Sequence, residues 1–107
     1  MTKIKFYRDK DGKYTGFECK GHSGYAESGE DIVCAAVSVL TINFANSVES
    51  LTSSLPETKE DECRGYLKVT IKDYDTDDVQ LLFKSLSLGL NGIRKEYPKF
   101  FDLTYDN

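Results

Sequence analysis

Apolar and polar residues alternate in four short segments of the chain, and this period of two predicts β-strands; a fifth, polar segment lies between them. In residues 2–8, for example, Ile4 and Phe6 alternate with lysines. The turns Asp9-Lys10-Asp11-Gly12 and Arg64-Gly65 join four of the segments in pairs, which predicts two hairpins. The third segment is so polar that we expect it at an edge of the sheet. The predicted strands are residues 2–8, 13–20, 57–63, 66–72 and 99–105.

Two longer segments show helical spacing instead. Asp31 is a good N-cap, so we expect Ile32 to be the first residue of the first helix and Cys34 the third. Apolar residues then recur every three or four positions until Leu51, and Pro56 follows the end of the helix. The second helix is expected to begin in the acidic run 73–78 and to end before Pro98. Its predicted core stripe is Val79, Leu82, Phe83, Leu86, Leu90, Ile93 and Tyr97.

The resulting element order is ββαββαβ, within one domain that spans residues 1–107. We expect an α+β (α/β) fold in which two long helices pack on a mixed, mostly antiparallel sheet. A chain of 107 residues is long enough for one core and too short for two. The first helix carries no charge between Asp31 and Glu49, which indicates that it is covered on most sides. A second subunit would supply part of that cover, so we expect a homodimer.

Charge and cysteine content narrow the class of function. The net charge of -4 argues against nucleic acid as a direct ligand. The alternating N-terminus does not resemble a signal peptide, and no segment has the run of apolar residues needed to cross a membrane. We therefore expect a cytoplasmic protein. There, Cys19, Cys34 and Cys63 would be free thiols, metal ligands or a nucleophile rather than disulfide partners.

The chain's only histidine lies in a glycine-rich stretch, residues 21–30, which we expect to be a mobile surface loop. Gly21, Gly24 and Gly29 give this stretch its freedom, and His22 follows the second predicted strand directly. In the first turn of a helix, Cys34 would lie at the positive end of the dipole, which favours a thiolate. An imidazole close to it can take up the thiol proton. The spacing therefore allows a Cys-His dyad, with free backbone N–H groups at the helix start to stabilise an oxyanion.

Several roles stay open on residue types alone. Asp31 caps the helix, orients His22, or does both, and Ser38 hydrogen-bonds either near the thiol or to its own helix. A zinc site is the competing hypothesis, formed by Cys19, His22, Cys34 and Cys63. It lacks paired Cys-x-x-Cys motifs, and Cys19 faces the core with Thr15 and Phe17. A third interpretation is that neither residue is catalytic, since buried cysteines and single histidines on the polar surface are both common in proteins.

These residues resemble the signature of the ribosomal-processing cysteine protease family, Prp. The family pattern of Gly-His, a glycine-bearing loop and Asp-x-Val-Cys-Ala-Ala-x-Ser is matched by Gly21-His22 and by Asp31-Ile32-Val33-Cys34-Ala35-Ala36-Val37-Ser38. Ser23 stands where many members have alanine. The resemblance extends over the full chain. It implies that Cys34 is the nucleophile and His22 its base, with Asp31 and Ser38 as supporting residues.

The resemblance also implies a substrate and a partner. Members of the family are homodimers that remove a short N-terminal extension from the large-subunit ribosomal protein L-twenty-seven, by cleavage after a pair of phenylalanines. An apolar groove beside Cys34 is therefore expected, and neither a metal nor another cofactor is needed. The alternative is a ribosome-associated peptide-binding module without catalysis, in which Cys34 is a small core residue.

Overall fold

The computed structural model describes residues 1–21, 28–61 and 65–106. It confirms the predicted order ββαββαβ. The strands and helices are β1 (Thr2–Arg8), β2 (Tyr14–Lys20), α1 (Ser28–Leu51), β3 (Pro56–Asp61), β4 (Tyr66–Ile71), α2 (Asp77–Glu96) and β5 (Phe101–Asp106).

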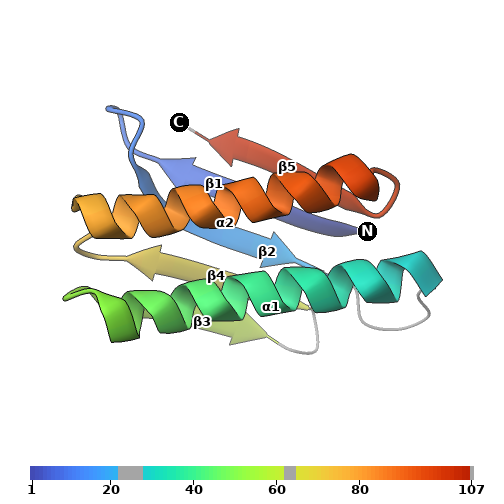
Figure 1. Ribbon diagram of the computed structural model, residues 1–107, viewed down its shortest axis with the longest axis horizontal. Coiled ribbons are helices and arrows are strands. Elements are labelled where there is room, and N and C mark those ends of the chain that lie inside the picture. The colour runs from blue at the N-terminus through green and yellow to red at the C-terminus, as the bar shows by residue number, and fades with distance from the viewer. Residues whose placement is uncertain (22–27, 62–64, 107) are drawn as a thin grey trace.

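Five strands form one sheet in the order β3-β4-β2-β1-β5. β1 and β5 are parallel and the three other neighbouring pairs are antiparallel, so the sheet is mixed and mostly antiparallel as predicted. Both helices lie side by side on one face of the sheet and run in opposite directions (Figure 1). α1 lies over β3 and β4, and β3 is an edge strand, which confirms the prediction made from its polar sequence.

The core lies between the helices and the sheet. α1 contributes a stripe of buried residues at helical spacing, Val33, Val37, Thr41, Phe44 and Val48. On the sheet, the antiparallel register pairs Phe6 with Phe17, and neither side chain is exposed. The remaining buried apolar residues are Ile4, Val69, Ile71, Val79, Phe83, Leu86, Leu90, Phe101 and Leu103.

The start of α1 differs from the prediction. The helix begins at Ser28, so Asp31 is its fourth residue and is not the N-cap. Gly29 therefore belongs to the helix and not to the loop that precedes it. The physical reason is that serine is preferred at helix starts as strongly as aspartate, so the sequence holds two candidate starts three residues apart.

A β-bulge changes which residues of β2 face the helices. The register shifts between Tyr7 and Arg8, so Tyr14 pairs with Arg8 and Thr15 becomes the extra residue. The Tyr14 ring consequently packs against Phe6 and Phe83, at centroid distances of 5.3 and 5.5 Å. Thr15 was predicted to share the core face of Phe17, and this was wrong because a bulge reverses the alternation beyond it.

The segment Asp31–Leu51 of α1 is long and apolar enough to cross a membrane by length and composition. A single helix of this kind is weak evidence for a membrane span, because the core helix of a globular domain passes the same test. In this chain Val33, Val37 and Val48 of the segment are packed in the core between helix and sheet.

Candidate active site

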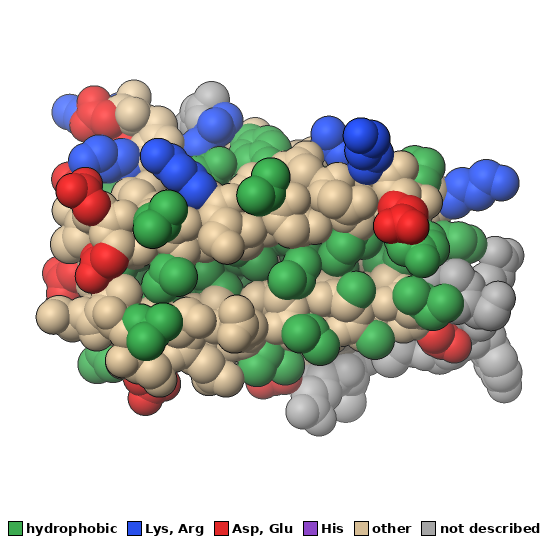
Figure 2. Space-filling view, in the orientation of Figure 1, with side chains coloured by type: hydrophobic (Ala, Val, Ile, Leu, Met, Phe, Trp, Pro, Cys, Tyr) green, Lys and Arg blue, Asp and Glu red, His purple; other side chains and the backbone are tan. Residues whose placement is uncertain are grey.

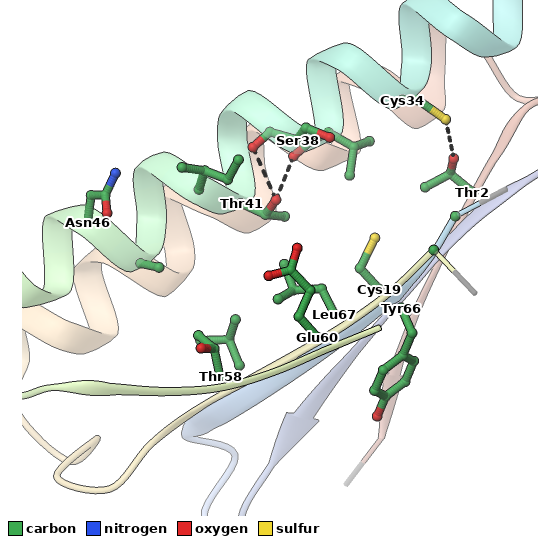
Figure 3. A pocket seen from close by; sticks show the side chains of 16 residues that line it. Thr2, Cys19, Cys34, Ser38, Thr41, Asn46, Thr58, Glu60, Tyr66 and Leu67 are labelled. Carbon is green, nitrogen blue, oxygen red and sulfur yellow. Dashed lines mark hydrogen bonds between the residues drawn. The ribbon is translucent and has the colours of Figure 1, made fainter. Parts of the chain in front are cut away.

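A groove of about 410 Å³ lies between α1 and the strands β3, β4 and β2. Figure 3 shows the Cys34 sulfur at one end of it and Asn46 of α1 toward the other. One face of α1 supplies most of its helical wall, because Cys34, Ser38, Thr41 and Ala45 follow each other at intervals of three or four residues. We call this cavity the α1–sheet groove.

The Cys34 thiol is half-buried and lies above the start of β1. Its Sγ is 3.3 Å from Oγ1 of Thr2, and either atom can be the donor. Thr2 is 2% exposed, since it opens the strand that is paired with both β2 and β5. The thiol thus has a fixed polar neighbour on one side and the groove on the other.

The environment of Cys34 differs from the predicted first turn. Because α1 begins at Ser28, Cys34 is its seventh residue and lies beyond the first turn. The field of the helix dipole falls off within that turn. A backbone N–H at the seventh position is also used in the helix, bonded to the carbonyl four residues earlier. The sequence placed the helix dipole and the free amides of the helix start next to Cys34. Because Cys34 lies beyond the first turn, neither of them acts on it directly.

A second cysteine, Cys19 of β2, also lines the α1–sheet groove. Burial raises the pKa of the Cys19 thiol to about 11, and the nearby Cys34 adds to this shift. Neither Cys19 nor Cys34 is in a disulfide. Cys19 pairs with Ile4 in the register and faces the core side of the sheet, as predicted. Its raised pKa keeps it protonated at neutral pH, so it is a poor nucleophile.

The two predicted supporting residues lie at different places. Ser38 lines the groove one turn after Cys34, and its carbonyl accepts a hydrogen bond from Oγ1 of Thr41 at 3.3 Å. Asp31 is exposed on α1, one turn before Cys34, and is not part of the described groove lining. Ser38 is therefore placed to contact a ligand in the groove, whereas the capping role of Asp31 is excluded.

The part played by Gly65 was not predicted from the sequence. This residue has a φ of 61° and lies against Gly21, whose N–H donates to the Gly65 carbonyl at 2.6 Å. A Cβ on Gly65 would come within 2.5 Å of the Gly21 carbonyl oxygen. The predicted Arg64-Gly65 turn was the only signal in the sequence, and it did not reveal that the turn touches the residue before His22.

His22, Gly24 and Cys63 lie outside the described residues, so neither the dyad nor the four-residue zinc set is tested by the geometry. Among the residues that the structure describes, no three histidine, cysteine or acidic side chains converge on one point. What the described part offers is a thiol at the end of an open groove. Such a groove suits an extended peptide, and a thiol at its end suits attack on a carbonyl carbon.

Comparisons with known proteins bear on this chemistry. The family model for cysteine protease Prp matches residues 1–102. A Staphylococcus aureus protein named ribosomal processing cysteine protease Prp is 32% identical over 105 residues, which are 98% of this chain and 99% of that protein.

Two crystal structures of an essential ribosomal processing protease Prp from S. aureus have the same fold. The complex with a substrate peptide has a TM-score of 0.93 and 28% sequence identity, over 99% of this chain and 100% of that one. The structure with a covalently linked product peptide has a TM-score of 0.88 and 29% identity, with the same coverage.

Proposed function

Because this chain belongs to the Prp family of ribosomal-processing cysteine proteases, we propose that it removes the N-terminal extension of ribosomal protein L-twenty-seven. The family makes the chain a cysteine protease and sets aside the alternative of a peptide-binding module without catalysis. The observation that carries the proposal is the position of the Cys34 thiol at the end of the α1–sheet groove. Residues such as Val37, Ile42 and Leu67 give this groove an apolar lining, which suits an aromatic pair before the cleaved bond.

We assign the nucleophile to Cys34 and the base to His22. His22 takes the thiol proton, and the thiolate sulfur attacks the carbonyl carbon of the peptide bond. The protonated imidazole then gives its proton to the leaving amine, and a thioester remains on Cys34. Water activated by His22 hydrolyses the thioester and restores the thiol. The covalently linked product peptide in the S. aureus relative supports a covalent route of this kind.

The remaining residues have lesser roles in the proposal. Activation of Cys34 falls to His22, because Cys34 lies beyond the first turn of α1. The hydrogen bond between Gly21 and Gly65 anchors the chain one residue before His22, which supports a role of the glycine-rich segment in bringing the imidazole to the thiol. Ser38 lines the groove and is the better candidate for substrate contact than Asp31, which we propose orients His22 from α1.

We also propose that the protein is a cytoplasmic homodimer without direct contact to nucleic acid. The two helices expose large apolar side chains on the face away from the sheet (Figure 2). We call these residues the helix-layer patch; they are Ile32, Val39, Ile42, Leu81 and Leu88. Apolar side chains gathered in this way are typical of an interface between proteins. The net charge of -4 supports the absence of a nucleic-acid ligand.

The experiment is mass spectrometry of a synthetic peptide that spans the extension and the first residues of mature L-twenty-seven. Wild type, Cys34→Ala and His22→Ala proteins are each incubated with it, and circular dichroism verifies that both variants are folded. We expect only the wild type to give two products, cut after the aromatic pair. Equal cutting by the Cys34→Ala protein would overturn the assignment of the nucleophile. Cutting of unrelated peptides but not of this one would overturn the substrate.

A further inference from the structure

One carboxylate lies in the otherwise uncharged lining of the α1–sheet groove. Among the described residues that line it, Glu60 of β3 is the only one with a charge. Figure 3 shows its carboxylate rising from β3 toward α1. The neighbours along the groove are neutral, and they include Thr58 on the same strand and Thr41 on the helix.

The register explains why Glu60 points into the groove. Its partner on β4 is Leu67, and Thr58 pairs with the buried Val69, so both β3 side chains lie on the helix side of the sheet. The intervening Lys59 pairs with Lys68 and belongs to the opposite face. At Glu60 a position on the helix side of this edge strand is thus occupied by an exposed charge and not by an apolar side chain.

The carboxylate has no cation of its own within the part of the chain that the structure describes. The ion pairs found there join Lys13 to Asp75 and Lys20 to Glu18, and Glu60 takes part in neither. An unpaired charge beside apolar groove walls is stabilised when a ligand brings the opposite charge. A charge that points inward can also blunt a sheet edge against aggregation, so the two explanations must be separated by experiment.

We propose that Glu60 is a specificity-determining residue that selects peptides with a lysine or arginine near the cleaved bond. This inference rests on the proposed function of the groove as the protease's substrate site. Cys34 and Glu60 both line the groove, so an extended peptide that follows it from Cys34 across the strands to the edge strand β3 would bring one of its side chains next to Glu60.

The register also limits where the basic residue lies. Glu60, Leu67, Cys19 and Ile4 form one row across the sheet, and Thr2, which contacts Cys34, is two residues before Ile4. This places Glu60 about 7 Å along the strands and about 14 Å across them from the thiol's neighbour. An extended peptide covers that distance in about five residues.

The test uses a mixture of peptides obtained by cutting a bacterial proteome after glutamate. Wild type, Glu60→Gln and Glu57→Gln proteins digest it, and mass spectrometry identifies the new ends. Glu57 is the matched control because it is on the same strand, is exposed like Glu60 and loses the same charge, but it lies outside the described groove lining. In parallel, the same proteins with the additional substitution Cys34→Ala are immobilised and used to capture peptides from the mixture. This capture measures binding without cleavage.

We expect lysine or arginine within five residues of the cut to be favoured about fivefold by wild type and Glu57→Gln, the upper end for an exposed ion pair. The preference should vanish in Glu60→Gln and reverse toward aspartate in Glu60→Lys. If wild type and Glu60→Gln show the same preference, the inference is wrong while the protease function stands. If nothing is cut, the proposed function fails. The captured peptides then still decide the role of Glu60, through the enrichment of lysine and arginine on the protein with Glu60 compared with the protein that carries Glu60→Gln.

Discussion

Cys19 and Cys34 line the same groove but have different surroundings. Burial raises the pKa of Cys19 to about 11, so at pH 8 only about one Cys19 thiol in a thousand is a thiolate. Cys34 is half-buried at the groove end and is the proposed partner of His22. We expect iodoacetamide at about pH 8 to modify Cys34 and to leave Cys19 unmodified. Peptide mapping by mass spectrometry after short reaction times measures both.

The same experiment has a pH control. The pKa of Cys19 is raised, so its thiol is protonated below about pH 10 and ionises only as the pH approaches the raised value. Its labelling should therefore increase steeply above about pH 10, provided that the protein is still folded. Equal labelling of Cys19 and Cys34 at neutral pH would contradict the difference in environment.

Gly65 combines a left-handed backbone with a close contact. Its φ is 61°, and a Cβ would meet the carbonyl oxygen of Gly21. We expect Gly65→Ala to lower the free energy of unfolding by about 1–3 kcal/mol, because both backbone strain and the clash act against the folded state. Urea titration measures the loss. The displaced Gly21 should also misplace the following His22, so kcat should fall.

Gly12 is the matched control for that variant. It also has a positive φ, 83°, but no atom lies within 4 Å of where its Cβ would be. Gly12→Ala therefore carries the backbone strain alone, about 1 kcal/mol. We expect its kcat to equal that of wild type, because its turn joins β1 to β2 at a distance from the groove lining. Equal losses of kcat in both variants would remove the special role of Gly65.

At the scale of the elements, one glutamine joins α2 to the irregular start of β2. Gln80 Oε1 accepts from the Tyr14 N–H at 2.9 Å, and Nε2 donates to the carbonyls of Tyr14 and Tyr74 at 2.8 and 2.9 Å. We expect Gln80→Ala to lower the free energy of unfolding by about 2–3 kcal/mol, since backbone groups of the bulged strand lose their partners. Thermal or urea unfolding measures this.

Lys84 provides the comparison for this substitution. It lies one turn further along α2 and is exposed, so Lys84→Ala changes helix propensity and little else. We expect it to stay within about 0.5 kcal/mol of wild type. If Gln80→Ala and Lys84→Ala have the same stability, the three hydrogen bonds contribute nothing net.

The elements were predictable to the extent that their signals were local. Alternation predicted four of the strands and helical spacing predicted both helices, and Thr76 with Asp77 and Asp78 forms the expected polar start of α2. The start of α1 was missed because Ser28 and Asp31 carry equivalent capping signals three residues apart. The bulge at Thr15 and the contact of Gly65 with Gly21 depend on strand pairing, which no local pattern contains.

The candidate site shows the same limit. The sequence predicted Cys34 as the nucleophile, which stays a prediction, and it did not show the groove or the helix-side charge of Glu60, because both follow from sheet order. β3 was correctly predicted as an edge strand from its polarity. The sequence did not show which of its charges face the helices, because that depends on the register with β4.

At the scale of the whole molecule, the helices lie on one face of the sheet and expose the helix-layer patch on their outer side. Val39 and Leu88 are 67% and 77% exposed, and both lie on helices otherwise packed on the core. A second copy seated on this patch would bury these side chains, and it would explain why α1 carries no charge between Asp31 and Glu49. We therefore expect twice the 12.1 kDa mass of one chain in solution.

Light scattering during size-exclusion chromatography measures the mass, and Val39→Asp and Leu88→Asp should each give the single-chain value. Leu55→Asp is the control, because Leu55 is 64% exposed but follows α1 and lies outside the patch.

Ile42 belongs to both the patch and the lining of the α1–sheet groove, so a second copy on the patch would border the peptide site. Dissociation should then raise KM for the peptide with a smaller change in kcat. A wild-type mass of one chain at every concentration would exclude this dimer, and unchanged KM in dissociated variants would show that each groove is complete within one chain.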